Sequence, residues 1–260
     1  MARPTGCAIV PVEALETATV LARVEWADSG QGAGAMLYDP RSLPEPGPQW
    51  LLPGTYGERA RPVAVGGRQS AWFVDGAFGA GVLRGYRRGG LAARVSRQSY
   101  LWQGEARTRS VAEVRLLAQL RAAGVRVPAP IAGGYWRTGM TYRAAILIAR
   151  IPGVHTLTER VLAGPLSHRV AHAVGTAIAD MHRAGVWHAD LNAFNILLDE
   201  QGDAWLIDFD RGRYGAVAPN ERRNNLLRLR RSLDKVAGPA GIAAWEGIDA
   251  AYRTAWDSHH

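Results

Sequence analysis

Lysine is almost absent from this chain of 260 residues, whose basic side chains are nearly all arginine. Lys235, near the C-terminal end, is the single lysine. A phosphate-binding site elsewhere in the chain therefore has to use arginine, which offers a planar fork of N–H groups rather than a point charge. The formal net charge of +8 favours an anionic partner. A phosphorylated metabolite, an anionic lipid surface and nucleic acid all meet that condition, so charge alone does not choose among them.

Cysteine and long apolar runs are scarce as well. Cys7 is the only cysteine, which excludes an internal disulfide framework and fits a reducing compartment. No apolar run reaches the roughly 18 residues needed to span a bilayer. The first residues are partly apolar, but Pro11, Glu13 and Glu16 interrupt the continuous run that a secretory signal needs. We therefore expect a protein that stays in the cytoplasm.

The first half of the chain predicts a β-rich unit. Residues 29–57 are rich in glycine and proline, which is typical of loops. After them, alternating apolar residues predict three short strands at 62–67, 70–76 and 79–86. Glycine turns separate these strands, so the sheet is expected to be antiparallel. The apolar run at 144–149 predicts a further, buried strand.

A helix is predicted between the third of these strands and the buried one. Val114, Leu117 and Leu120 recur at helical spacing and form one apolar face. Ser110 with Glu113 three residues later matches the capping-box pattern of a helix start.

The second half predicts a helical unit around one hairpin. Apolar side chains recur at helical spacing over residues 170–181, and Gly185 follows as a typical helix end. Two short strands are predicted at 195–198 and 204–207, and the chain from Asn220 onward predicts mostly helix. The fold class that follows is α+β with two lobes and a cleft between them. Its parts are an N-terminal extension of unclear structure (1–62), a β-rich nucleotide-binding N-lobe (63–150) and a helical C-lobe (151–260).

The most informative segment is the loop after the predicted helix, together with the hairpin that follows it. The loop reads H-x-D-L-x-x-x-N from His188 to Asn195, and the hairpin ends in D-F-D at Asp208. The loop can present Asp190 to a substrate hydroxyl, while the hairpin returns Asp208 beside Asn195. An amide oxygen and a carboxylate that converge suit Mg²⁺. Phosphoryl transfer needs such a metal site and a carboxylate that orients and deprotonates the hydroxyl. Each residue alone would more often be a turn or a cap, so the specificity lies in the joint spacing.

These residues resemble the catalytic loop and metal-binding motif of the protein-kinase-like superfamily. More narrowly, the segments HADLN, DFDRG and YRRGG resemble the 3-deoxy-D-manno-octulosonic acid (Kdo) kinases of Gram-negative bacteria. The resemblance implies a two-lobed kinase-like fold, with ATP and Mg²⁺ as cofactors. It implies phosphorylation of the 4-hydroxyl of Kdo on a lipid A precursor, in lipopolysaccharide core biosynthesis. It also implies a peripheral protein at the cytoplasmic side of the inner membrane, with an anionic membrane surface and no nucleic acid among its partners.

The nucleotide-binding residues are harder to assign, because the strand lysine of protein kinases is missing. Arg84 occupies the matching place, with Arg87 and Arg88 as alternatives a few residues on. Glu113, or Glu105 as a rival, is expected to orient this arginine from the helix.

The candidate phosphate-covering loop is a glycine turn between the first two predicted strands. It contains Gly66, Gly67 and Arg68. A glycine pair in a hairpin is weak evidence by itself, because hairpins need glycine for their own geometry.

Two further departures from the protein-kinase pattern bear on regulation. Ala189 precedes the catalytic aspartate where many protein kinases have the arginine that receives an activation-loop phosphate. Asp210 replaces the glycine after Asp208-Phe209, and its stiffer backbone makes a flip of this segment less favourable.

The C-terminal helix has an apolar stripe flanked by arginines. Such a helix fits either an anionic bilayer surface or a core position with a solvated charged face. The stripe consists of Leu226, Leu229, Leu233 and Val236, and the flanking arginines are Arg222, Arg223, Arg228, Arg230 and Arg231.

Two other classes of function stay open. A phosphotransferase for another small molecule or for a protein would use the same catalytic residues, although a polycationic antibiotic suits a basic chain poorly. A catalytically silent nucleotide-binding module would account for the missing lysine. Such a module has no need, however, of Asp190, Asn195 and Asp208 together.

Overall fold

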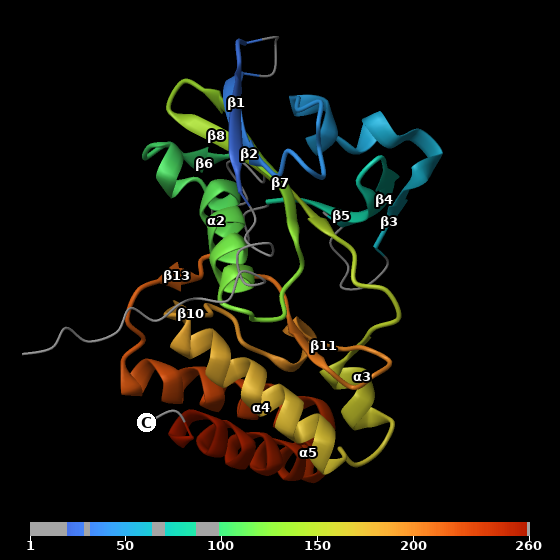
Figure 1. Cartoon of the computed structure of the whole chain (residues 1–260), viewed down its shortest axis with the longest axis vertical. Coiled ribbons are helices and arrows are strands. Elements are labelled where there is room, and N and C mark those ends of the chain that lie inside the picture. The colour runs from blue at the N-terminus through green and yellow to red at the C-terminus, as the bar shows by residue number, and fades with distance from the viewer. Residues whose placement is uncertain (1–19, 29–31, 64–70, 87–98, 259–260) are drawn as a thin grey trace, which may run out of the picture.

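The computed structural model describes residues 20–28, 32–63, 71–86 and 99–258. These residues form a mixed α+β molecule with a sheet lobe, up to Ala149, and a helical lobe from Arg150 onward (Figure 1). The predicted fold class, an α+β kinase-like arrangement of a β-rich part and a mainly helical part, is confirmed.

The sheet lobe is built on one eight-stranded sheet. Its strands follow the order β1-β2-β7-β8-β5-β4-β3, while β6 pairs with β8 beside this path. Helix α2 (Arg109–Ala122) packs against β7 and β8. The strands are β1 (Ala22–Trp26), β2 (Ala33–Tyr38), β3 (Ala60–Pro62), β4 (Ala71–Gly76), β5 (Gly79–Gly85), β6 (Tyr100–Leu101), β7 (Pro130–Thr138) and β8 (Thr141–Ala149). Short 3-10 helices are η1 (Pro48–Leu51), η2 (Pro53–Arg59) and η4 (Glu105–Arg107).

Residues 29–57, which we predicted to be loop, contribute a strand inside the sheet. β2 pairs with β1 on one side and with β7 on the other. A Cβ on Gly34 would lie 1.9 Å from the carbonyl oxygen of Tyr135 and 2.7 Å from the Trp26 ring, so glycine here permits close packing rather than a turn. The loop prediction is therefore wrong for this strand.

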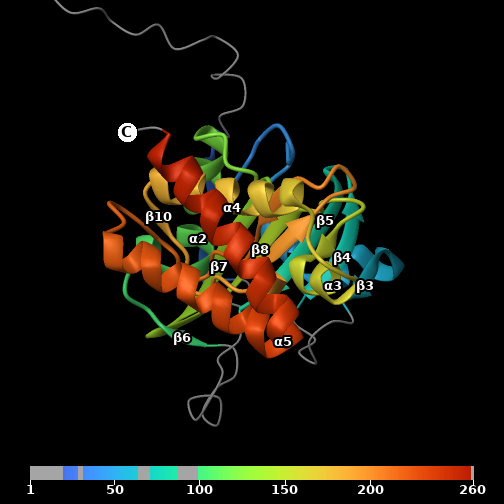
Figure 2. The same cartoon turned by 90° about the horizontal axis from the view of Figure 1, so that it is seen from below.

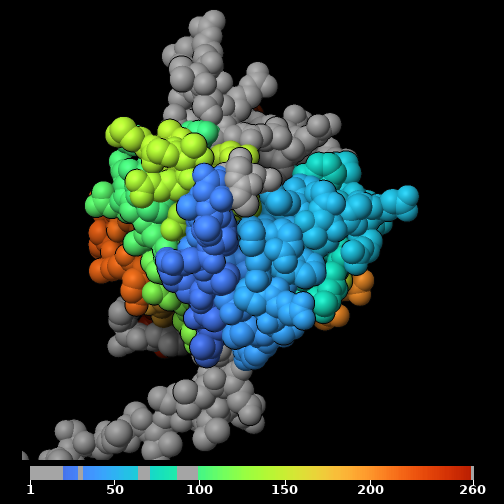
Figure 3. Space-filling view, turned by 90° about the horizontal axis from the view of Figure 1, so that it is seen from above, coloured from blue at the N-terminus to red at the C-terminus, as the bar shows by residue number. Residues whose placement is uncertain are grey.

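The described residues before position 63 contribute three strands, β1, β2 and β3, to this same sheet. β3 pairs with β4 across that position, and both lie at one edge of the sheet. Seen from above, this first segment forms much of the surface of the sheet lobe (Figure 3). The predicted antiparallel strands at 70–76 and 79–86 are confirmed as β4 and β5, which pair with each other. The strand predicted at 62–67 lies almost wholly outside the described residues, and β3 ends at Pro62. The turn that contains Gly66, Gly67 and Arg68 lies outside the described residues.

The predicted helix is confirmed as α2, but its predicted capping box is wrong. Thr108 is the N-cap, and it makes no side-chain capping bond. Ser110 donates its hydroxyl proton to the carbonyl oxygen of Gly134 on β7 (2.8 Å). The helix lies very close to this strand, because a Cβ on Gly133 would be 2.4 Å from Val114. Glu113 is buried between the helix and the sheet instead of returning to the helix start.

The helical lobe is a pair of long helices with short strands above them (Figures 1 and 2). α5 kinks at Gly238, which has a non-helical φ of 52° and is followed in the chain by Pro239. The helices are α3 (Leu157–Leu162), α4 (His168–Arg183) and α5 (Pro219–Asp257). The short elements are β9 (His155–Thr156), β10 (Val186–Trp187), η5 (Ala193–Asn195), β11 (Ile196–Leu198), β12 (Ala204–Leu206) and β13 (Arg213–Tyr214).

The apolar stripe of α5 faces the core. Leu226, Leu229 and Leu233 are all buried, so they are core residues and cannot face a bilayer. The two helices approach closely: a Cβ on Gly175 of α4 would lie 2.6 Å from the backbone nitrogen of Tyr252. Among the described helices, none has both the length and the apolarity to span a membrane.

One buried histidine joins α4 to α5. His182 donates from Nε2 to the amide oxygen of Asn225 (3.1 Å) and accepts at Nδ1 from the hydroxyl of Tyr252 (3.0 Å). Both bonds use the neutral ring. Burial lowers the pKa of His182 from its ordinary value of 6.5 to about 4.

We predict that stability falls as the pH is lowered through this range. Between pH 6.5 and about 4 the unfolded chain binds the His182 proton and the folded chain does not. Protonation therefore favours unfolding, and the free energy of unfolding should fall by up to about 3 kcal/mol. Urea unfolding of wild type and His182→Gln across this range measures the effect. The difference between the two stabilities should shrink with falling pH; a constant difference would assign the titration to another group.

Candidate active site

The candidate catalytic loop runs from β10 to η5 and presents Asp190 at the surface, with its side chain 52% exposed. His188, which is buried, supports the loop from beneath. Its Nε2 donates to the carbonyl oxygen of Ile207 and its Nδ1 accepts from the backbone N–H of Asp190, each at 3.0 Å. Burial lowers the pKa of His188, which keeps the ring neutral in this geometry. His188 therefore supports the backbone of the loop.

Asn195 and Asp208 are brought together by the β11–β12 hairpin. The backbone N–H of Ile207 donates to the carbonyl oxygen of Asn195 (3.0 Å), which sets Asp208 next to it. The Asn195 amide nitrogen donates to the carbonyl oxygen of Asp190 (2.9 Å), so its amide oxygen is left to face a cation. Asp208 has a φ of 63°, a left-handed conformation that is uncommon outside glycine and often marks functional sites.

Arg84 reaches across from β5 to the same place. Its Nη1 donates to Asp208, and its Nη2 donates to both carboxylate oxygens of Glu113 (2.6 Å each). The hydroxyl of Tyr86 also donates to Glu113 (2.5 Å). The pairing expected between Arg84 and Glu113 is therefore present, with Asp208 as a third member.

Burial and charge act in opposite directions on these carboxylates. The Glu113 side chain is only 2% exposed, and burial raises its pKa although the Arg84 guanidinium opposes the rise. Burial acts in the same sense on Asp208, but there the Arg84 guanidinium prevails and the pKa of Asp208 is lowered. Asp208 is thus held in the ionised form that a metal ligand needs.

The alternative candidates for the Arg84–Glu113 pair either have other partners or lie outside the described residues. Glu105 accepts from Arg23 (2.7 Å) and from the hydroxyl of Tyr135 (2.9 Å), so it does not orient Arg84. Arg87 and Arg88 fall in a stretch that the structure does not describe.

Asp210 has a partner that the sequence did not reveal. Arg109, at the start of α2, donates to both oxygens of its carboxylate, from Nε at 2.7 Å and from Nη2. Phe209 between the two aspartates is fully buried against the His188 ring. The segment after β12 is therefore tied to the sheet lobe by two arginines, Arg84 and Arg109. The only signal in the sequence was the unusual aspartate itself.

Arg228 is a second functional candidate that the sequence did not identify. We grouped it with the arginines that could face a bilayer, but its Nε donates to Oδ1 of Asp190 (2.7 Å) and its Nη2 to the same oxygen (2.5 Å). The structure thus places this arginine beside the candidate base. Its helical spacing from Asn225, which bonds the backbone of His188, is what turns it toward the loop.

The donor set fits a magnesium ion that keeps most of its ligands from water and phosphate. Asn195 and Asp208 offer an amide oxygen and a carboxylate, which are hard ligands. Within the described chain, no cluster of three or more His, Cys, Asp or Glu side chains is arranged to hold a metal. Two protein oxygens leave the remaining positions around such a cation to water and phosphate oxygens.

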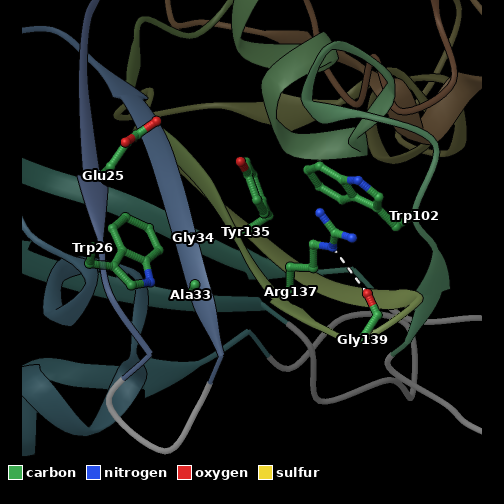
Figure 4. A pocket seen from close by; sticks show the side chains of 8 residues that line it. All are labelled: Glu25, Trp26, Ala33, Gly34, Trp102, Tyr135, Arg137 and Gly139. Carbon is green, nitrogen blue, oxygen red and sulfur yellow. Dashed lines mark hydrogen bonds between the residues drawn. The ribbon is translucent and has the colours of Figure 1, made fainter.

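A separate hollow lies on the sheet lobe, away from these residues. Its volume is about 470 Å³, and its walls come from β1, β2, β7 and the segment after β6 (Figure 4). Arg137 lies over the Trp102 ring there, 4.9 Å from its centroid, and donates to the carbonyl oxygen of Gly139 (3.0 Å). None of the predicted catalytic or metal-binding residues lines it.

Comparison with known proteins points to one family. The profile of the lipopolysaccharide kinase (Kdo/WaaP) family matches residues 56–252. A 3-deoxy-D-manno-octulosonic acid kinase of Stenotrophomonas maltophilia (strain K279a) is 49% identical over 230 residues, covering 88% of this chain and 91% of the relative. A protein of the same name from Xanthomonas axonopodis pv. citri (strain 306) is 50% identical over 211 residues, covering 80% of this chain and 84% of the relative.

We predict that Glu113→Gln lowers the free energy of unfolding by about 1–3 kcal/mol, because a buried charged acceptor of Arg84 and Tyr86 is lost. Glu105→Gln is the matched control. It neutralises a carboxylate that also pairs with an arginine and a tyrosine, yet lies closer to solvent, so its cost should be about 0–1 kcal/mol. Urea unfolding measures both. Equal losses would contradict a special role for the Arg84–Glu113 pair.

Proposed function

Because this chain belongs to the lipopolysaccharide kinase (Kdo/WaaP) family and is thus an ATP-dependent phosphotransferase, we propose that it phosphorylates the 4-hydroxyl of a Kdo residue on a lipid A precursor. The observation that carries the proposal is the convergence of Asp190, Asn195 and Asp208 below Arg84 and Glu113. A module that only binds nucleotide would not need an exposed carboxylate in the catalytic loop beside two metal ligands.

In the proposed reaction Asp190 orients the acceptor hydroxyl and takes its proton. The hydroxyl oxygen forms a bond to the γ-phosphorus of ATP, and the bond from that phosphorus to the β–γ bridging oxygen breaks. The products are ADP and the phosphorylated sugar, with the hydroxyl proton passed to the carboxylate. Oδ2 of Asp190 is the oxygen suited to this task, because Arg228 occupies Oδ1.

The donor is held from the opposite side of the site. Asn195 and Asp208 would hold Mg²⁺, which when bound neutralises charge on the phosphates. Arg84 would bind the phosphates of the nucleotide, with Glu113 fixing its orientation. The assignment of Gly66, Gly67 and Arg68 to a phosphate-covering loop remains a prediction from the sequence.

We also propose a peripheral location at the cytoplasmic side of the inner membrane. A lipid-linked acceptor requires the enzyme to work at a membrane surface, and the net charge of +8 would favour an anionic one. Leu226, Leu229 and Leu233 of α5 are buried and unavailable for this contact, so it would rest on exposed arginines instead. Nucleic acid is not among the proposed partners.

Asp190→Ala and Asp190→Asn should reduce phosphate transfer by about 10²- to 10⁴-fold, because the proton acceptor is lost. The assay incubates the protein with MgATP and Kdo-bearing lipid A precursor and detects one added phosphate by mass spectrometry. Asp180→Asn, on the exposed side of α4, removes the same charge and should keep full activity. No transfer by wild type despite bound ATP would reject the Kdo acceptor; no ATP binding would favour a silent module.

Removal of divalent cations with EDTA should abolish the transfer, and added Mg²⁺ should restore it. Asn195→Ala should raise the Mg²⁺ concentration needed for half-maximal rate by about 10-fold or more, because one of two protein ligands is lost. Asn224→Ala changes an exposed amide on α5 and serves as the control. An unchanged Mg²⁺ requirement in Asn195→Ala would remove this residue from the metal site.

A further inference from the structure

Helix α5 turns three polar side chains toward the catalytic loop. Asn225 bonds both backbone groups of His188, at 2.8 and 3.3 Å, and the hydroxyl of Ser232 accepts from the backbone N–H of Ala193 (3.1 Å). Arg228 lies between them on the same helix face and donates to Asp190. Because the helix is fastened to the loop on either side of Arg228, the position of this guanidinium beside Asp190 is set by the fold.

The contact between Arg228 and Asp190 is easily opened. The two side chains are 48% and 52% exposed, and an ion pair at such a site contributes about 0–1 kcal/mol. Only Nε and Nη2 of the guanidinium are used, and both bond the same carboxylate oxygen. Among the described residues, Nη1 has no hydrogen-bond partner, so the edge of the fork formed by Nη1 and Nη2 is free to bind another group.

A cation fixed on a general base makes it a weaker proton acceptor, since it stabilises the unprotonated form. The arrangement becomes productive if the guanidinium is shared with an anion that the acceptor itself brings. A carboxylate matches the free edge of the fork in bidentate geometry. The acceptor of the proposed reaction is a sugar acid, which carries such a group on the ring that bears the reacting hydroxyl.

We propose that Arg228 binds the carboxylate of the acceptor sugar and so places its hydroxyl against Oδ2 of Asp190. This inference rests on the proposed function. The placement of the two arginines supports it. Arg84 comes from the sheet lobe and contacts Asp208, on the side assigned to the nucleotide, whereas Arg228 comes from α5 and contacts Asp190, on the side of the acceptor. A sugar without an anionic group would offer this guanidinium no charged partner.

The test combines a change in the protein with a change in the substrate. Wild type and Arg228→Gln are assayed with an acceptor that carries a single Kdo, either with its free carboxylate or with that carboxylate converted to a primary amide. Both acceptors are dispersed in neutral detergent, so membrane charge plays no part. Arg228→Lys reports whether charge alone suffices. Arg231→Gln removes a charge from an exposed position of the same helix and is the matched control.

Wild type should lose about 10- to 100-fold in kcat/KM when the carboxylate becomes an amide, as expected for a charge-assisted bidentate contact. Arg228→Gln should lose as much with the free acid, but should then distinguish the two acceptors by less than about 3-fold. Arg231→Gln should behave as wild type. The binding of ATP should be unchanged in all variants.

Other outcomes overturn the inference in distinguishable ways. If Arg228→Gln still discriminates against the amide as strongly as wild type does, the arginine does not bind the carboxylate. If kcat falls equally with both acceptors while discrimination persists, Arg228 acts on the transferred phosphoryl group instead. If wild type phosphorylates neither acceptor, the proposed function fails and this inference fails with it.

Discussion

The ion pair of Arg84 with Glu113 and Asp208 is the interaction on which the candidate site depends. It joins β5, α2 and the end of the β11–β12 hairpin through one guanidinium, and so links the two lobes directly. Removing one partner of a buried charge pair leaves the other charge uncompensated, at a cost well above that of a surface ion pair. The side chains therefore hold one another in place. The contact that orients the candidate phosphate-binding arginine also positions a candidate metal ligand.

Arginine suits this place because its donors point in two directions. A lysine ammonium is a single point of charge, whereas Arg84 serves one carboxylate with Nη1 and another with Nη2. Arg109 also uses several donors: Nε and Nη2 bond Asp210, two residues beyond Asp208, and Nη1 bonds the hydroxyl of Tyr100. The pair of arginines holds the chain on both sides of the buried Phe209. The stiffness expected of Asp210 from its backbone thus has a side-chain cause as well.

The residues of the site that could be predicted are those that the local chain brings together. Asn195 and Asp208 meet through a short hairpin, so spacing was enough to pair them. Arg228 contacts Asp190 across 38 residues of sequence, and no spacing rule connects them. Local rules also failed where tertiary packing opposed them: Glu113 matches a capping box, but burial against Arg84 takes it away from the helix start. Strand β2 lies in a stretch rich in glycine and proline and was missed for a similar reason, since close packing and turns both require glycine.

The position of Arg228 indicates the charge of the acceptor more directly than the net charge of the chain does. The overall charge of +8 is a weak guide, because many of the arginines are already paired with carboxylates. A guanidinium within hydrogen-bonding distance of the candidate base is a stronger guide to the charge of the acceptor, because its field acts where the acceptor must bind. A polycationic acceptor would meet repulsion at the reacting centre itself. An acid meets attraction there, so local geometry favours an anionic sugar for a reason that composition alone could not supply.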